Sequence, residues 1–383
     1  MEIQDLLKTA VERKASDLHI KVGSPPVLRI DDRLVPLTEK PRISADDAVR
    51  IAFTLMNNQQ RERFKERHEA DIAYSVPGLG RFRVNIFQQR STVGLVLRVI
   101  PVKVQTISDL NLPPIIEKLS FEPRGLVLIT GTTGSGKSTT LAAMIHHINT
   151  QHRGHIITIE DPIEFLHRDN RCLVNQREIG MDTESFAGAL RAALRQDPDV
   201  ILVGEMRDFE TISTALLAAE TGHLVLSTLH TVDAAETINR IIAVYPPYQQ
   251  KQVRLQVAAV LKGIVSQRLV PRADGRGRVP AVEVMVSTAT IRECIADPDK
   301  TRKIPEFIAA GQAQYGMQTF DQSLMTLYQR GLIAYEEALR WASNPDDFAL
   351  RARGIESSTD QSWVTNPAEG GHPPFPGFER TSR

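Results

Sequence analysis

The fold of this chain can be approached from the stretch Leu126-Val127-Leu128-Ile129-Thr130-Gly131-Thr132-Thr133-Gly134-Ser135-Gly136-Lys137-Ser138. Its first part is a continuous apolar run, which is typical of a strand buried on both faces of a sheet. Its second part matches the phosphate-loop pattern Gly-x-x-x-x-Gly-Lys-[Ser/Thr] in full. A strand before the loop and a helix after it are the context that this motif requires, so the stretch predicts a P-loop nucleoside triphosphatase.

Each part of the loop has a chemical reason for its residue type. Glycines let backbone amides close around phosphate oxygens, and the helix that begins there adds the positive end of its dipole. Lys137 is expected to contact the β- and γ-phosphates, and the Ser138 hydroxyl is expected to ligate Mg²⁺. The predicted nucleotide-binding residues of this segment are Gly131, Thr132, Thr133, Gly134, Ser135, Gly136, Lys137, Ser138 and Thr139.

The chain after the loop alternates between two patterns. Further apolar runs lie at 156–159, 200–203 and 224–229, and helical patterns lie at 138–149, 183–195 and 209–221. This alternation favours an α/β fold with a parallel sheet covered by helices. From 234 to 343 the sequence predicts a mostly helical region, interrupted at 271–280.

A smaller α+β domain is predicted over residues 1–100. Apolar residues at helical spacing predict a first helix, 46–66 reads as one or two helices, and 81–100 alternates like a hairpin or meander. We expect a linker over 101–114 and the ATPase domain over 115–350. Residues 351–383 are rich in loop formers and are expected to form a disordered tail.

Composition excludes several classes of protein. The 383 residues carry 46 Lys plus Arg against 46 Asp plus Glu, so no global basic field draws the chain to nucleic acid or an anionic membrane. Its two cysteines, Cys172 and Cys294, are too few for a disulfide framework or a four-cysteine zinc site. The sequence contains no run of about 18 apolar residues that could span a membrane. Its start is acidic and does not resemble a secretory signal. We therefore expect a cytoplasmic protein.

Acidic residues follow two of the predicted strands. The apolar run at 200–203 leads to Glu205, the place where a Walker-B acid holds the Mg²⁺ shell in a parallel sheet. Glu160, Asp161 and Glu164 follow the run at 156–159, and three neighbouring carboxylates repel one another unless a cation or water binds there. We expect this cluster near Mg²⁺ and the attacking water. The Asn-Lys-x-Asp motif of GTPases is absent.

Histidines and arginines are weaker candidates. His223 and His230 bracket the run at 224–229 and could report the state of the γ-phosphate to a neighbour, or they could be ordinary packing residues. Arginine forks bind phosphate bidentately, so arginines on the strands of the first domain could reach a nucleotide held by the second domain. The candidates are Arg81, Arg83, Arg90 and Arg98, with Arg195 and Arg207 as alternatives acting in trans.

These motifs together resemble a family. The phosphate loop, 157–164, 197–205 and 221–231 resemble, in that order, the Walker A, Asp box, Walker B and His box of secretion ATPases. Ala15-Ser16-Asp17-Leu18-His19-Ile20, followed by Pro25-Pro26, resembles the start of type IV pilus retraction ATPases. The resemblance covers residues 1 to about 345.

The resemblance implies a fold, an assembly and a set of roles. It implies a PAS-like N-terminal domain, a RecA-like ATPase domain and a hexameric ring with ATP and Mg²⁺ at the subunit interfaces. The ring would lie in the cytoplasm under a PilC-like inner-membrane platform protein, with a PilU-like ATPase as a further partner. Glu164 matches the glutamate that positions water, and Glu205 matches the Walker-B acid. Arg81, Arg83, Arg98 and His230 become nucleotide-site candidates.

The C-terminal part bears on the direction of the motor. Thr290-Ile291-Arg292-Glu293-Cys294-Ile295 resembles the retraction motif Ala-Ile-Arg-Asn-Leu-Ile but departs from it at three positions, and the segment 316–324 matches more closely. The alternatives are an accessory ATPase of the PilU type, a RecA-like nucleic-acid motor using Arg272, Arg276 and Arg278, and a non-catalytic ring component.

Overall fold

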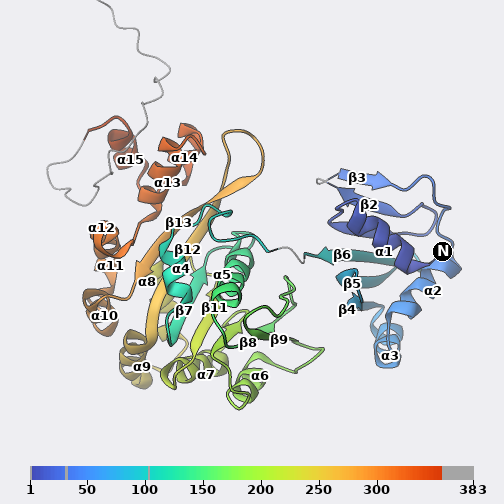
Figure 1. Ribbon diagram of the computed structural model, residues 1–383, viewed down its shortest axis with the longest axis horizontal. Coiled ribbons are helices and arrows are strands. Elements are labelled where there is room, and N and C mark those ends of the chain that lie inside the picture. The colour runs from blue at the N-terminus through green and yellow to red at the C-terminus, as the bar shows by residue number, and fades with distance from the viewer. Residues whose placement is uncertain (1, 31–32, 102–103, 356–383) are drawn as a thin grey trace, which may run out of the picture. The chain divides into compact units, whose positions relative to one another are not determined.

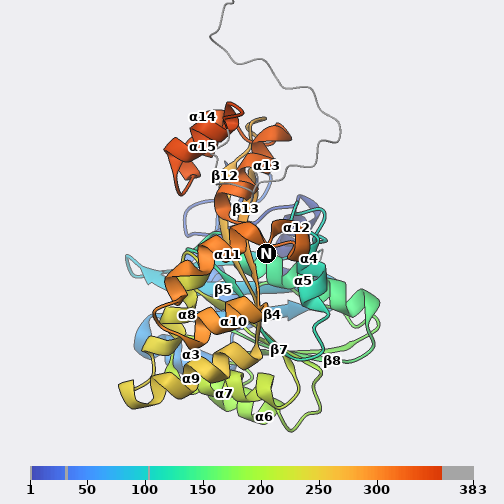
Figure 2. The ribbon, with the colours of Figure 1, turned by 90° about the vertical axis from the view of Figure 1, so that its left-hand side faces the viewer.

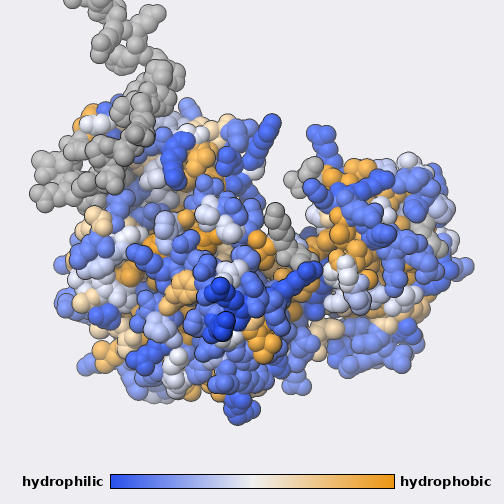
Figure 3. Space-filling view, viewed as in Figure 1, coloured by the Kyte–Doolittle hydropathy of each residue, from blue (hydrophilic) through white to orange (hydrophobic). Residues whose placement is uncertain are grey.

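A computed structural model describes residues 2–30, 33–101 and 104–355 (Figure 1). The chain divides into two compact units, one of residues 1–103 with 164–167, the other of residues 104–163 with 168–383. Each unit has its own hydrophobic core. On the face of each unit that Figure 3 shows, hydrophilic residues dominate and hydrophobic ones are scattered, as expected for a chain with balanced charge.

The first unit is an antiparallel sheet packed against helices. Its sheet has the strand order β3-β2-β1-β6-β5-β4. The strands are β1 (Asp17–Ile20), β2 (Val27–Ile30), β3 (Arg33–Pro36), β4 (Glu69–Val76), β5 (Gly80–Gln89) and β6 (Thr92–Ile100). The helices are α1 (Ile3–Glu12), α2 (Ala45–Leu55) and α3 (Asn58–Arg67). Ser44 and Asn57 begin α2 and α3 with capping boxes, which explains why the segment 46–66 splits into two helices.

Alternation along the strands positions the core of this unit. Phe82, Val84 and Ile86 are buried on one face of β5, together with the apolar stripe of α1. The predicted first helix and the predicted meander at 81–100 are therefore confirmed. Arg90 was expected on a strand, but it lies in the turn between β5 and β6 with a φ of 44°.

The second unit is built on a sheet of order β13-β12-β7-β11-β10-β8-β9. All neighbours are parallel except β12 and β13, which form an antiparallel hairpin. The strands are β7 (Gly125–Thr130), β8 (His155–Glu160), β9 (Leu173–Glu178), β10 (Val200–Val203), β11 (Leu224–Leu229), β12 (Leu261–Pro271) and β13 (Arg278–Val286). The strands predicted at 200–203 and 224–229 have the expected bounds.

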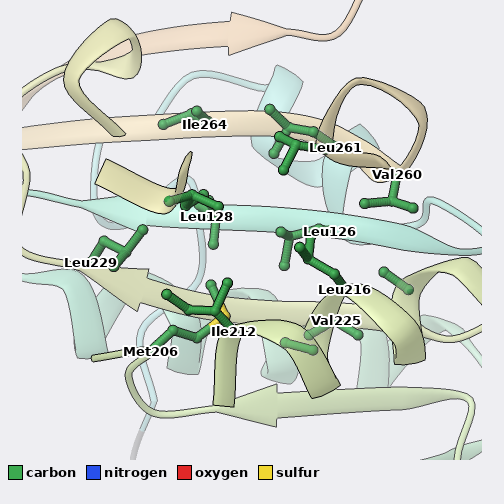
Figure 4. Close-up of a cluster of buried hydrophobic side chains, with 14 of the residues drawn as sticks. Leu126, Leu128, Met206, Ile212, Leu216, Val225, Leu229, Val260, Leu261 and Ile264 are labelled. Carbon is green, nitrogen blue, oxygen red and sulfur yellow. The ribbon is translucent and has the colours of Figure 1, made fainter. Parts of the chain in front are cut away.

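Helices cover both faces of this sheet. α4 (Ile115–Ser120) precedes the first strand, and the helices between the strands are α5 (Lys137–Gln151), α6 (Phe186–Ala193), α7 (Phe209–Glu220), α8 (Ala234–Ala243) and α9 (Pro247–Val260). Leu126 and Leu128 point to the face covered by α7, whereas Val127 and Ile129 point to the face covered by α5. Burial on both faces is why the strand at the phosphate loop is apolar without interruption. Figure 4 shows the first of these cores, with Ile212 and Leu216 of α7 facing the sheet.

The C-terminal region contains the main correction to the sequence prediction. Residues 234–343 are mostly helical, as predicted, but the hairpin of β12 and β13 lies in their middle, where only an interruption at 271–280 was expected. β12 pairs with β7 and is buried on both faces, and an apolar run of this kind cannot be distinguished from a helix by periodicity alone. The strand β9 was also not predicted, and α6 begins at Phe186 rather than near Thr183, because Ser185 caps its N-terminus.

The remaining helices follow the hairpin. They are α10 (Ala289–Ala296), α11 (Ile304–Ala310), α12 (Gln312–Tyr315), α13 (Phe320–Gln329), α14 (Tyr335–Trp341) and α15 (Pro345–Ala352), with a 3-10 turn at Thr301–Lys303. In Figures 1 and 2, α13 to α15 gather at the end of the β12–β13 hairpin, where Val270 and Val279 share a core with Leu324 and Phe348. The predicted tail lies outside the described residues from 356 onward.

The segment expected to be a linker is partly packed. Ile107 and Leu112 are buried in the core formed with α4 and α5. The part of this segment from residue 104 on therefore belongs structurally to the second unit.

Candidate active site

The phosphate loop joins β7 to α5. Gly131, Gly134 and Gly136 have φ angles of 139°, 78° and 91°, which residues with a side chain rarely adopt. The Lys137 ammonium is nearly buried and donates hydrogen bonds to the carbonyls of Gly131, at 2.8 Å, and Thr132, at 3.0 Å. The loop therefore curls around its own lysine at the N-terminus of α5, as a phosphate site requires.

Glu205 lies at the same edge of the sheet. It follows β10, and β11 separates β10 from β7. Because these strands are parallel, their carboxyl ends bring the phosphate loop, Glu205 and His230 to one edge. The Glu205 carboxylate pairs with His230 Nε2 at 3.2 Å and with Arg207 Nε at 2.6 Å, and its side chain is mostly buried. The structure thus brings together the predicted Walker-B acid and one predicted histidine.

The other predicted histidine is separated from this site. His223 precedes the first residue of β11, at the opposite end of the strand from His230. Its Nδ1 lies 2.9 Å from the carbonyl oxygen of Ala218 at the end of α7. Within this chain His223 therefore lies apart from the Glu205 site, and a role of the histidine pair toward a neighbouring subunit stays a prediction.

Glu160, Asp161 and Glu164, which follow β8, are not grouped so that together they could ligate one metal ion. Glu160 accepts hydrogen bonds from the Thr158 hydroxyl, at 2.6 Å, and from the Gln176 amide, at 3.1 Å. Asp161 is exposed, and Glu164 is exposed and is grouped with the first unit. No group of three or more His, Cys, Asp and Glu side chains among the described residues is arranged to hold a metal ion.

Glu178 is a buried acid next to this segment that the sequence did not single out. Its carboxylate accepts a hydrogen bond from the backbone N–H of Ile163, at 3.2 Å, one residue before Glu164. Asp182 in turn accepts a bond from the Glu178 N–H at 2.8 Å. The turn that carries Glu164 is thus supported by β9, a strand that sequence reasoning missed.

The candidate arginines have different surroundings. Arg98 Nε donates to the nearly buried carboxylate of Asp17, at 3.0 Å, joining β6 to β1. Arg81 and Arg83 lie on β5, where Arg83 is opposite Arg98 in the ladder. Arg195 is exposed and bonds the carbonyl of Arg191, whereas Arg207 pairs with Glu205. Arg98 therefore already forms an ion pair within the first unit.

Comparison with known proteins identifies the family. A family model described as "Type II/IV secretion system protein" matches residues 1–340. The chain belongs to this family.

Members of the family are similar to this chain over most of its length. It is 47% identical over 352 residues to the type IV pilus retraction ATPase PilT of Pseudomonas aeruginosa, covering 91% of this chain and 100% of that protein. It is 45% identical over 361 residues to the type IV pilus ATPase PilU of the same organism, covering 94% of each. A crystal structure of the pilus retraction motor PilT with bound ADP matches with a TM-score of 0.83 at 45% identity, over 91% of this chain and 98% of that one.

Family membership confirms the predicted architecture. The chain has the α/β fold of secretion ATPases, with a PAS-like α+β N-terminal domain, a RecA-like P-loop ATPase domain and a helical C-terminal part. Within the described residues, no helix combines the length and the apolar character needed to cross a bilayer.

Proposed function

We propose that this chain is the ATPase subunit of a motor that powers type IV pilus retraction, the withdrawal of pilin subunits that drives twitching motility. The observation that carries the proposal is the grouping of the phosphate loop, Glu205 and His230 at one edge of the sheet. The similarity to PilT over nearly the whole chain supports the choice of retraction within the family.

The residues present are suited to a nucleotide and a divalent cation. The loop is a cradle in which a Cβ on Gly131 would lie 2.4 Å from a backbone oxygen, and the buried Ser135 hydroxyl has no hydrogen-bond partner among the described residues. The Ser138 hydroxyl and the Glu205 carboxylate are hard oxygen ligands of the kind that Mg²⁺ prefers. When bound there, Mg²⁺ would offset the negative charge of the phosphates.

We assign the roles of the protein groups as follows. The loop amides from Gly131 to Thr139 and the Lys137 ammonium bind and orient the phosphates. Glu205 holds the cation shell with Ser138, and Glu164 orients the attacking water. His230, bonded to Glu205, senses the phosphate end of the nucleotide. Arg81, Arg83 and Arg98 are proposed to contact nucleotide from a neighbouring subunit, with Arg98 having to leave Asp17 to do so.

ATP hydrolysis by the purified chain tests this function. We expect Mg²⁺-dependent turnover that Glu205→Ala lowers at least 100-fold while ADP still binds, because Lys137 and the loop amides remain. Lys137→Ala should lose ADP binding itself. ATP turnover by Glu205→Ala at the wild-type rate would remove Glu205 from the site.

We propose that the active form is a homohexamer at the cytoplasmic side of the inner membrane, bound to a PilC-like platform protein. Similarity to PilU favours one alternative, an accessory retraction ATPase. A strain with this chain as its only retraction ATPase separates the two: pilus retraction supports the main motor, and its loss supports the accessory role.

A nucleic-acid motor is less well supported, because Arg272 in the proposed basic cluster pairs with Asp274 at 3.1 Å. Strong stimulation of ATP hydrolysis by DNA would favour it.

A further inference from the structure

Gln267 on β12 contacts the phosphate loop from the neighbouring strand. Its side chain is 2% exposed. The amide Nε2 donates a hydrogen bond to the Ser135 carbonyl, at 2.7 Å, and Oε1 accepts one from the Thr140 hydroxyl, at 2.9 Å. One buried amide therefore bonds both the loop and the first turns of α5.

The same residue also limits the space around the loop glycines. A Cβ on Gly131 would lie 2.4 Å from the Gln267 carbonyl oxygen, and a Cβ on Gly136 would lie 2.9 Å from its Nε2. Gln267 thus abuts the loop near its start and near its end.

Strand pairing holds Gln267 in place. The preceding residue, Ser266, is paired with Thr130 in the parallel ladder of β12 and β7, and their hydroxyls are 2.9 Å apart. On the other side, Gln267 is paired with Val282 of β13. Because both neighbouring strands are fixed by main-chain hydrogen bonds, the amide is pre-organised toward the loop.

The bond to Ser135 has a consequence for phosphate binding. In a trans peptide the C=O and the following N–H point in opposite directions. A hydrogen bond that holds the Ser135 carbonyl toward Gln267 therefore directs the Gly136 N–H away from Gln267.

We propose that Gln267 is a positioning residue of the nucleotide site, which sets the orientation of the Ser135–Gly136 peptide and so the affinity of the loop for phosphate. This inference rests on the nucleotide binding proposed above. Gln267 acts through the loop backbone and is not a catalytic residue. Sequence patterns do not indicate this role, because Ser135 and Gln267 are 132 positions apart and meet only through the pairing of β12 with β7.

Binding of a fluorescent ADP analogue to the full-length chain tests the proposal. Gln267→Met keeps the size of the side chain and removes both hydrogen bonds, so we expect ADP affinity to fall about tenfold. Gln322→Met is the matched control, because Gln322 is also 2% exposed and its amide bonds Ala309 and Gln312 instead. The control should lower thermal stability similarly and leave ADP affinity within about twofold of wild type.

Thr140→Val provides a second arm, since it removes only the bond to Oε1. We expect a loss of ADP affinity of roughly threefold, and less than additive losses when it is combined with Gln267→Met. Folded Gln267→Met with wild-type affinity would overturn the inference. Should that variant not fold, unchanged affinity in Thr140→Val would overturn it. Wild-type protein that fails to bind ADP would instead overturn the proposed function, and the inference with it.

Discussion

Gly131 illustrates how one residue of the phosphate loop is constrained by a distant strand. Its φ of 139° is unfavourable for any side chain, and a Cβ would also collide with the Gln267 carbonyl at 2.4 Å. Gly134 has a φ of 78°, but apart from its two chain neighbours no heavy atom of the described residues lies within 4 Å of a Cβ placed there. The two glycines therefore share a backbone requirement and differ in the space around them.

This difference predicts unequal effects of alanine. Gly131→Ala should lower ADP affinity more than tenfold, because the loop or β12 must move to relieve the collision. Gly134→Ala should cost only the backbone strain, about 1–2 kcal/mol, and should weaken binding less. Binding of ADP, with folding checked by circular dichroism, compares them. Equal affinities of the two variants would show that the contact with Gln267 does not matter.

At the scale of elements, β13 holds the start of α8. Glu283 of β13 is buried and accepts a hydrogen bond from the Ala234 N–H, at 2.9 Å, in the first turn of α8. Burial raises the pKa of Glu283 to about 7, and the nearby Asp233 and Asp321 raise it as well, against the opposing effects of the Ala234 bond and Arg268. Arg268 of β12 lies over the Phe320 ring, 3.8 Å from its centroid, so this junction joins β12, β13, α8 and α13.

A raised pKa gives the stability a definite pH dependence. The unfolded carboxyl titrates near 4.5, so its contribution to stability is fully present below that pH and is lost as the pH rises through about 7. Glu283→Gln stays neutral and should therefore gain stability relative to wild type between about pH 5 and pH 7.5. The gain is on the order of 3 kcal/mol at most. Unfolding temperatures of both proteins across this range test it, and a constant difference would contradict it.

At the scale of the molecule, α10 carries the segment that resembles the retraction motif, with one face buried in the ATPase unit and the other exposed. Ile291, Cys294 and Ile295 are buried in its core, whereas Arg292 is exposed and donates to the Ser287 carbonyl at 2.9 Å. The exposed residues of this segment are Thr290, Arg292 and Glu293, and Arg292 is the one cation among them.

Arg292→Ala should therefore leave ATP hydrolysis intact and abolish pilus retraction. We expect ATP turnover within about twofold of wild type, because Arg292 lies outside the phosphate loop and the Glu205 pair, and loss of pilus retraction in cells. Arg302→Ala, at another exposed arginine in the nearby 3-10 turn, should retain both activities. ATPase assays and microscopy of fluorescent pili measure the two. Normal retraction by Arg292→Ala would exclude a role for this motif.

The sequence by itself determined the features that depend on neighbouring residues. The phosphate loop, the buried strands β7, β10 and β11, the helix α1 and the position of Glu205 after a strand are all local patterns of apolarity, glycine and charge. Because these patterns repeat over a few residues, they could be read without knowing the tertiary fold.

Only the tertiary structure decided which distant groups meet. Strand pairing places Gln267 against the phosphate loop, Glu283 against α8 and Arg98 against Asp17, and it brings His230 but not His223 to Glu205. It also makes strands of β12 and β13, where the apolar pattern alone favoured helices. The physical reason is that pairing and burial depend on contacts between segments far apart in the chain, which no local pattern records.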